Sequence, residues 1–164
     1  MRRLCILIFT CCSFLCITAE PVNAEQKGHI ELKMMVEQEV TVTDESGEKN
    51  VKRTGAKLVL PGDEVIYTII YRNISKEEAT GVVITNPIPE HMIYTAGSAL
   101  GEDTEIVYSV DGVHFDIADK LKVALPDGGE RPATAEDYSH IRWIIKTPLP
   151  PGKKGDVSYH ARLK

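Results

Sequence analysis

The stretch VIYTIIYRN, residues 65–73, decides the fold class of this chain. Every second residue is large and apolar, and this alternation is the pattern of a β-strand with one buried face. The buried face would carry Val65, Tyr67, Ile69 and Tyr71. Ile66 and Ile70 make the other face partly apolar as well. Because the turn residues Pro61-Gly62-Asp63 precede this stretch and Asn73 ends it, we expect a central strand here.

A longer alternation precedes this strand. Apolar residues occupy the even positions from Ile30 to Val42, with Gln38 as the exception, and this alternation predicts a half-buried strand. Strands are usually shorter than this, so we expect a kink or a change of sheet near Glu37 and Gln38. Residues 44–47 have turn composition, and Val51 to Thr54 is expected to pair back as a short hairpin arm.

The second half of the sequence predicts further strands separated by turns. A strand at Val82 to Ile84 would stop at Pro87 and Pro89, because proline cannot donate to a ladder. Asp111-Gly112 predicts a tight hairpin turn within Tyr108 to Phe115, because this dipeptide tolerates positive φ angles. The remaining elements are a loop at residues 127–132, one helical turn at residues 134–137, a strand with Ile141, Trp143 and Ile145 inward, and a last strand with Val157, Tyr159, Ala161 and Leu163 inward.

These features together predict a single all-β domain, an antiparallel β-sandwich. Strands follow one another at short spacing, the turns are rich in proline and glycine, and helical periodicity is almost absent. The domain would comprise residues 25–164, and a chain of this length can bury about two thirds of its unfolded surface without disulfides.

The N-terminal segment predicts export. All four cysteines, Cys5, Cys11, Cys12 and Cys16, lie in one apolar stretch behind Arg2 and Arg3. That stretch, Leu4 to Thr18, is too short for a membrane-spanning helix of about 20 residues, and it is typical of a cleaved signal peptide of the general secretory route. We place the cut after Ala24, so residues 1–24 are the signal peptide. The exported domain is expected to carry no lipid and to be periplasmic or extracellular.

The charged residues and the cysteines of the chain limit the kinds of molecule that it is expected to bind. The chain has 19 Lys and Arg against 24 Asp and Glu, a net charge of −5 with neutral histidines. Nucleic acids and anionic lipids require clustered Lys and Arg, whereas these charges are spread along the chain. We therefore expect no nucleic-acid binding and no membrane insertion after the signal is removed. Since every cysteine leaves with the signal, neither disulfides nor thiol chemistry are expected in the domain.

Three segments carry a family resemblance. They read LVLPGDEVIYTIIYRN at residues 58–73, ATGVVITNPIP at residues 79–89 and YTAGS at residues 94–98. Together they resemble the DUF11 family, a repeat of exported bacterial surface proteins. The resemblance implies an immunoglobulin-like β-sandwich with a structural or adhesive role. Asn86 stands where the family commonly has aspartate, and this difference weakens the transfer of a charge or cation role to this turn.

The side chains that could support chemistry do not form a recognisable motif. The histidines are His29, His91, His114, His140 and His160, and none has the i, i+2 or i, i+4 spacing of a zinc-binding pair. The acidic pairs Glu77-Glu78, Glu102-Asp103 and Glu136-Asp137 fall in expected loops, where carboxylates are usually solvated. Ser98 lacks the glycine spacing of a nucleophile elbow. Asn73-Ile74-Ser75 fits a glycosylation sequon, but we interpret Asn73 as a strand end. We predict no catalytic, cofactor-binding or metal site, and no cofactor.

The aromatic residues divide into two groups. Trp143, Tyr67, Tyr71 and Tyr159 share faces with aliphatic residues, which favours core packing over a sugar-stacking platform. Tyr94, Tyr138 and Phe115 lie nearer to expected loops. If the domain binds a glycan or a peptide, we expect these loop aromatics and Glu136-Asp137 to form the site.

The sequence thus predicts an exported, non-catalytic structural or protein-interaction module of the bacterial cell envelope. Its partner would be another envelope or surface protein. The alternative is a ligand-binding module for a glycan or an extended peptide, in which an exposed sheet edge takes up the peptide as a strand. The run from Ile30 to Val42 and the final strand are the candidate edges. An enzyme would require converging polar groups in a deep pocket.

Overall fold

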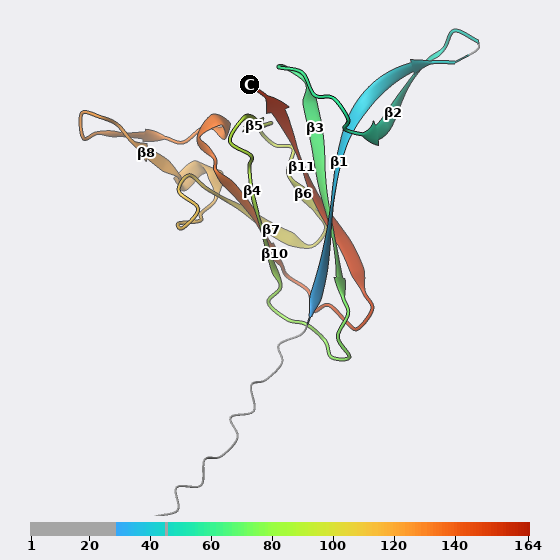
Figure 1. Cartoon of the computed structure of the whole chain (residues 1–164). Coiled ribbons are helices and arrows are strands. Elements are labelled where there is room, and N and C mark those ends of the chain that lie inside the picture. The colour runs from blue at the N-terminus through green and yellow to red at the C-terminus, as the bar shows by residue number, and fades with distance from the viewer. Residues whose placement is uncertain (1–28, 45) are drawn as a thin grey trace, which may run out of the picture.

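The computed structural model describes residues 29–44 and 46–164 as an arrangement of strands and two short 3-10 turns (Figure 1). The strands are β1 (Ile30–Thr43), β2 (Lys49–Gly55), β3 (Glu64–Asn73), β4 (Val83–Pro87), β5 (Met92–Tyr94), β6 (Leu100–Gly101), β7 (Thr104–Ser109), β8 (Lys122–Ala124), β9 (Glu130–Pro132), β10 (His140–Ile145) and β11 (Lys154–Leu163). The turns are η1 (Ala118–Lys120) and η2 (Ala135–Asp137). The expected signal peptide lies outside the described residues. Within these two ranges, no helix has the length and apolar character needed to cross a bilayer.

The strands form antiparallel sheets, which confirms the predicted all-β antiparallel class. The larger sheet has the order β2-β1-β3-β11-β5, and the short β6 also pairs with β11. The smaller sheet has the order β4-β10-β7, and β8 and β9 form a separate two-stranded hairpin. Figure 1 shows the hairpin β8-β9 and the arm formed by β1 and β2 projecting from opposite sides of the body.

The core lies between the larger and the smaller sheet. Trp143 on β10 and Tyr159 on β11 are both 0% exposed, with their ring centroids 6.2 Å apart. The predicted inward residues Val157 and Ala161 are buried beside Tyr159. The indole nitrogen of Trp143 donates to the carbonyl oxygen of Leu100 at 3.1 Å, so the polar atom of this buried ring is satisfied.

Strand β3 occupies the predicted central position. It pairs with β1 on one side and with β11 on the other. The prediction that the final strand is an edge is wrong, because β11 lies between β3 and the short strands β5 and β6. In the immunoglobulin order the last strand pairs with the penultimate long strand, whereas here β10 pairs with β4 and β7. The order of these strands therefore differs from the immunoglobulin order.

Several local predictions are confirmed and others are corrected. Strand β4 ends at Pro87, and η2 is the expected helical turn, closed by a capping box between Thr134 and Asp137. Residues 127–132 are not all loop, since Glu130–Pro132 form β9 and pair with β8. Strand β1 is continuous where a kink was expected. It instead exchanges partners at Glu37, which is the last residue paired with β3 and the first paired with β2.

Candidate functional site

The strongest candidate is one side of the first half of β1. Strand β1 pairs with β3 from Ile30 to Glu37, but on its other side β2 pairs with it only from Glu37 to Thr43. No strand of the described part of the chain occupies the β2 side between Ile30 and Val36. This segment of seven residues, which we call the free edge, is paired with β3 on one side and has no strand on the other. The sheet also ends at its two outermost strands, β2 and β5.

The hydrogen-bonding groups that the free edge presents follow from two neighbouring contacts. The carbonyl oxygen of Val36 accepts from the amide of Ala56, which follows β2, and that of His29 accepts from the amide of Ile74, which follows β3, both at 3.0 Å. The N–H and C=O of one strand residue point to the same side, and this side alternates along the strand. The N–H and C=O groups of the even-numbered residues of β1 therefore point toward the β2 side. At the free edge these are the peptide groups of Ile30, Leu32 and Met34.

The side chains of the same even residues form an apolar stripe on the inner face of the sheet. Leu32 is 55% exposed, Met34 49% and Val36 36%. Their partners across β3 are Tyr71, Ile69 and Tyr67, which belong to the core or pack against it. The stripe is exposed although it lies on the same face of the larger sheet as the core residues of β3. The smaller sheet therefore covers this face at β3 and leaves it largely exposed at β1. The expectation that this face is half-buried is wrong for Leu32 and Met34.

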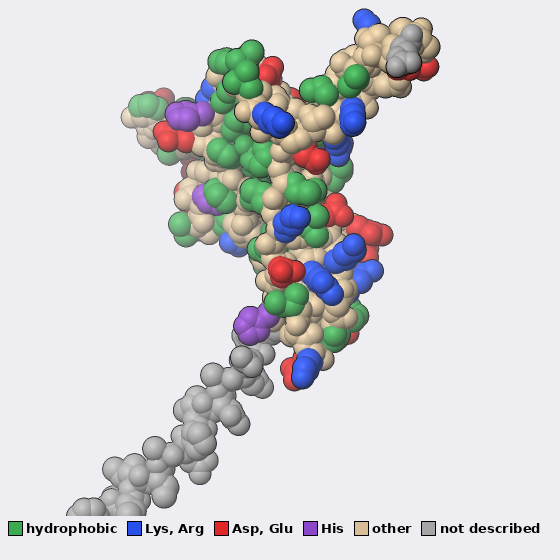
Figure 2. Space-filling model, turned by 45° about the vertical axis from the view of Figure 1, so that its right-hand side comes forward, with side chains coloured by type: hydrophobic (Ala, Val, Ile, Leu, Met, Phe, Trp, Pro, Cys, Tyr) green, Lys and Arg blue, Asp and Glu red, His purple; other side chains and the backbone are tan. Residues whose placement is uncertain are grey.

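The stripe lies on the half of β1 that precedes the β1-β2 arm. Figure 2 shows this arm standing clear of the body and hydrophobic side chains exposed across the middle of the same view. Farther along the arm, Val40 and Val42 are also exposed. Exposed apolar side chains on a strand next to unpaired backbone groups are features of a surface that binds another strand.

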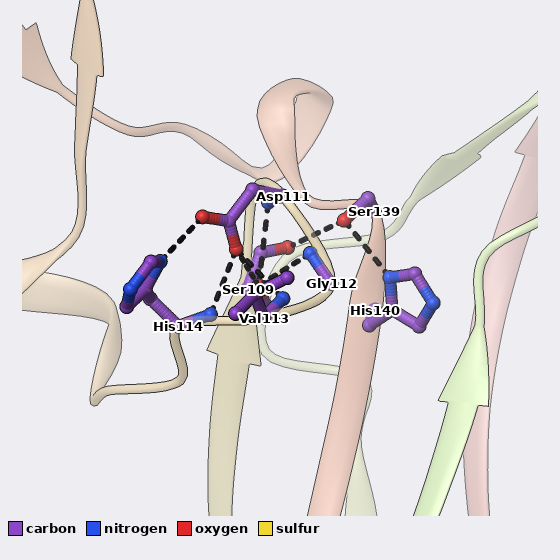
Figure 3. Close-up of polar contacts among 7 residues, drawn as sticks. All are labelled: Ser109, Asp111, Gly112, Val113, His114, Ser139 and His140. Carbon is purple, nitrogen blue, oxygen red and sulfur yellow. Dashed lines mark hydrogen bonds and ion pairs between the residues drawn. The ribbon is translucent and has the colours of Figure 1, made fainter.

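A second cluster surrounds Asp111, in the loop after β7 (Figure 3). The Oδ1 of Asp111 accepts from the hydroxyl of Ser109 and from the amides of Val113 and His114, and its Oδ2 lies 2.6 Å from Nδ1 of His114. The hydrogen bond from the His114 side chain is the main reason that the pKa of Asp111 is well below its ordinary value. These bonds determine the shape of the loop. In place of the predicted hairpin, the structure has a single antiparallel bridge between Tyr108 and Asp116.

The Asp111 cluster contains Ser, Asp and His but lacks the geometry of a catalytic triad. In a triad the histidine lies between the serine and the aspartate. Here Asp111 lies between Ser109 and His114, and Ser109 is 0% exposed. The second histidine in Figure 3, His140, meets the hydroxyl of Ser139 through Nδ1 at 2.9 Å, and that hydroxyl also donates to the carbonyl of Ser109. This hydroxyl is therefore engaged in bonds that close the loop.

Three other polar residues considered from the sequence, Asp137, Ser98 and His160, also have structural partners. Asp137 forms a bidentate ion pair with Arg131, at 2.6 and 2.7 Å, and this contact holds the pKa of Asp137 low. The hydroxyl of Ser98 donates to the carbonyl of Thr95 and accepts from the amide of His160. The ring of His160 is 2.7 Å from the carboxylate of Glu64. These groups hold turns and strands together.

Two asparagines are buried. Asn73 is 0% exposed, so its sequon side chain is enclosed in the folded domain, as expected of a residue that ends a strand. The amide of Asn86 donates to the hydroxyl of Tyr159 and to the carbonyl of Pro87, both at 2.9 Å. Asn86 therefore points into the core.

The aromatic residues fill the interior rather than a sugar platform. Trp143, Tyr71 and Tyr159 are buried as predicted, and Tyr67 stacks on Tyr159 with centroids 4.9 Å apart. Tyr94 ends the short strand β5 next to a loop, but it is only 3% exposed and is therefore buried in the core. The other two expected loop aromatics are also occupied. Tyr138 stacks on Tyr108 at 4.7 Å, and the guanidinium carbon of Arg142 lies 3.4 Å from the centroid of the Phe115 ring.

A cleft of about 540 Å³ lies where β6, β10 and β11 meet. Its polar lining comprises Tyr71, three carboxylates and three cationic side chains: Glu102, Asp103, Asp156, Arg53, Lys153 and Lys154. Burial, and then the nearby charges of Asp156, Glu102 and Asp103, raise the pKa of Tyr71 above its ordinary value. The mixture of carboxylates, cationic groups and a phenol could hydrogen-bond a polar ligand such as a sugar.

Metal binding has no support in the described ranges. Among residues 29–44 and 46–164, no group of three or more His, Cys, Asp or Glu side chains is placed to hold an ion. Comparison of the chain with known protein families, with curated proteins and with solved structures finds no match. The sequence resemblance described above therefore depends on the quoted segments alone.

The sequence predicted the run from Ile30 to Val42 as a candidate edge, and the first half of this run, Ile30 to Val36, is an open edge. The exposure of Leu32 and Met34 could not be derived from the sequence, because alternation identifies a face without telling whether a second sheet covers it. The cleft was also missed, because the residues that line it, among them Tyr71, Glu102 and Asp156, come from segments that are distant in the chain.

Proposed function

We propose that this protein is an exported, non-catalytic interaction module of the bacterial cell envelope that binds an extended segment of another envelope protein at the free edge of β1. The observation that carries the proposal is the free edge itself, where the unpaired peptide groups of Ile30, Leu32 and Met34 adjoin the exposed side chains of Leu32 and Met34. Main-chain pairing supplies affinity in such complexes, and pockets for alternate side chains supply specificity.

The surroundings of the free edge support strand addition. Natural sheets commonly protect an open edge with proline, charged side chains such as lysine, a bulge or a covering loop. The segment from Ile30 to Val36 carries Glu31 and Lys33, but it contains no proline and no glycine, and it is continuously paired with β3 along its other side. It is therefore held in the extended shape that a partner strand needs, which lowers the entropic cost of binding.

Export is proposed from the N-terminal sequence and from the resemblance of residues 58–98 to the DUF11 family. The mature protein should then begin at Glu25 without a lipid. Intact mass of the protein recovered from the envelope fraction tests this. A mature chain that starts at Cys12 or Cys16 with added acyl mass would contradict both the cleavage site and the absence of a lipid.

A non-catalytic role is proposed because the Ser, Asp and His side chains nearest to a catalytic arrangement form structural bonds. The Asp111 cluster shapes a loop, Asp137 pairs with Arg131, and Ser98 joins two backbone segments. None of these arrangements pairs a nucleophile with a base in the order that catalysis requires.

Site-specific photocrosslinking in growing cells tests the proposed interaction. A photoreactive amino acid at Lys33 stands on the outer face beside the free edge, and the same amino acid at Lys122 on the β8-β9 hairpin is a matched control, since both lysines are exposed on strands. We expect a crosslinked protein from position 33 and none from position 122. Equal crosslinking at the two positions, or none at either, would contradict the proposal.

The alternative, a glycan-binding module, is favoured by the cleft beside Tyr71. Its test is binding of envelope polysaccharide fragments to the wild type and to the Asp156→Asn variant, with Asp127→Asn as a control in a remote loop. Binding that only Asp156→Asn weakens would support the cleft as the functional site.

A further inference from the structure

The geometry points to a second copy of this chain as the strand that binds the free edge, so that two copies pair β1 against β1 in antiparallel fashion and their larger sheets become continuous. This inference rests on the proposed edge-pairing function, and it names a second copy of this chain, in place of a different envelope protein, as the strand that occupies the edge. A twofold axis through Leu32 relates the copies. In such a contact each residue meets its counterpart at equal distance from the axis, and the interface is the same patch on both subunits.

The direction of the backbone groups selects the register. When Leu32 faces Leu32 of the second copy, Ile30 faces Met34. These even residues all point their N–H and C=O groups away from β3. Each becomes a hydrogen-bonded pair, in which both N–H···O bonds are exchanged. No peptide group engaged with β3 is needed for the contact.

The side chains fit the same register on both faces. On the outer face Glu31 lies opposite Lys33 of the second copy, and symmetry repeats this opposite-charge pair. On the inner face Ile30 meets Met34, and the two Leu32 side chains meet on the axis. Directly opposite residues of opposite charge stabilise a strand pair, and like charges destabilise it. The exposed stripe at Leu32 and Met34 would thus be covered by its own counterpart.

Neighbouring registers do not fit. An axis through Lys33 places two lysines directly opposite, and an axis through Glu31 places two glutamates opposite. An axis through Met34 places Glu31 opposite Glu37, which are like charges, and Glu37 is already paired with β2. This register also requires the carbonyl oxygen of Val36, which already accepts a hydrogen bond from the amide of Ala56. With the axis on Leu32, pairing extends from His29 to Met35 and stops before β2 begins.

Charge exchange provides a test that reports the register. The chain from Glu25 onward contains every described residue, and its mass in solution is measured by analytical ultracentrifugation over a range of concentrations. The wild type should shift from monomer to dimer as concentration rises. Glu31→Lys alone and Lys33→Glu alone each place like charges in both symmetric pairs, so each should weaken self-association about tenfold or more.

Recombining the charges should restore the dimer. An equimolar mixture of the Glu31→Lys and Lys33→Glu proteins brings opposite charges together again in a heterodimer, and the double variant does so in a homodimer. Both should regain the dimer mass. Loss of self-association in the single variants without recovery in the mixture would overturn the register and with it the proposal.

A backbone variant supplies an independent control. The N–H of Leu32 points to the free edge, so Leu32→Pro should abolish the dimer and leave the thermal melt nearly unchanged. The N–H of Lys33 points to β3, so Lys33→Pro should lower the melting temperature. A wild type that stays monomeric at every concentration refutes self-pairing. If Lys33 then still crosslinks to a different envelope protein, the proposed function stands, and if it crosslinks to nothing, both proposals fail.

Discussion

Replacement of Asn73 by aspartate should unfold the domain more easily, and the loss should depend on pH. The side-chain amide of Asn73 donates to the carbonyl oxygens of Glu77 and Leu149, both at 2.7 Å. Its Oδ1 accepts from the amide and the hydroxyl of Ser75, at 2.9 and 2.7 Å. A carboxylate of nearly the same shape keeps the two bonds from Ser75. It loses both donated bonds and places a negative charge against two carbonyl oxygens.

The magnitude follows from two contributions. Two lost hydrogen bonds cost about 2 kcal/mol together, because each contributes about 1 kcal/mol. Burial and the two carbonyls disfavour the ionised form, so the folded pKa of the new carboxyl rises above its unfolded value of about 3.9. A rise of about 2 pKa units adds roughly 2.7 kcal/mol to the loss of unfolding free energy at neutral pH. We expect Asn73→Asp to lower the free energy of unfolding by about 4 to 5 kcal/mol at neutral pH.

The pH dependence has a definite sign. A folded pKa above the unfolded pKa means that the folded state holds the proton longer, so stability falls as the pH rises through this interval. At about pH 4 the carboxyl is protonated in the folded state, and the cost of Asn73→Asp should shrink toward about 2 kcal/mol.

Urea denaturation of wild type and variant at both pH values measures the difference directly. Asn50→Asp is the control, because Asn50 is exposed on β2 and donates only a 3.3 Å bond to Asp44. It should cost under about 1 kcal/mol. A loss for Asn73→Asp that is below about 1 kcal/mol, or that is equal at both pH values, would refute the buried donor role of Asn73.

Three further predictions concern packing and redox state. Tyr67→Ala should lower the free energy of unfolding by about 2 to 3 kcal/mol, because the ring of Tyr67 stacks on the buried Tyr159. The neighbouring Thr68→Ala should lower it by under about 1 kcal/mol, and urea titration compares the two variants. Gly155→Ala should cost about 1 to 3 kcal/mol, since a Cβ there would overlap the hydroxyl of Tyr71, while Gly55→Ala has open space and should change stability by under about 0.5 kcal/mol in the same assay. The thermal melt of the exported domain should be identical with and without a thiol reductant, because its sequence holds no cysteine, and a melting temperature that falls on reduction would contradict the signal-peptide assignment.

Much of the strand layout could be read from local patterns. The alternation at Val65 to Tyr71 identified β3, and the alternation of the last ten residues identified β11 with its buried face. The prolines after β4 and the capping residues of η2 act within a few residues of themselves, so their effects were also predictable. Local hydrogen bonding and hydrophobic periodicity are properties of a short segment, and a sequence contains them fully.

The Asp111 loop shows where local rules compete. The Asp-Gly signal predicted a tight hairpin, but the carboxylate of Asp111 binds two later amides and the ring of His114, and this closes a wider loop. Both outcomes satisfy the same backbone groups. The choice between them depends on how the loop packs against Ser139 and His140, which lie about thirty residues away.

By itself, the sequence determined the all-β class, the positions of most strands and which face of each strand is apolar. Only the tertiary structure decided that β11 lies inside the sheet, that β2 covers only half of β1, and that the smaller sheet leaves Leu32 and Met34 exposed. The physical reason is that alternation with a period of two residues fixes the side to which a side chain points. Whether a neighbouring strand fills an edge, or a second sheet covers a face, depends on contacts between segments that are distant in the chain.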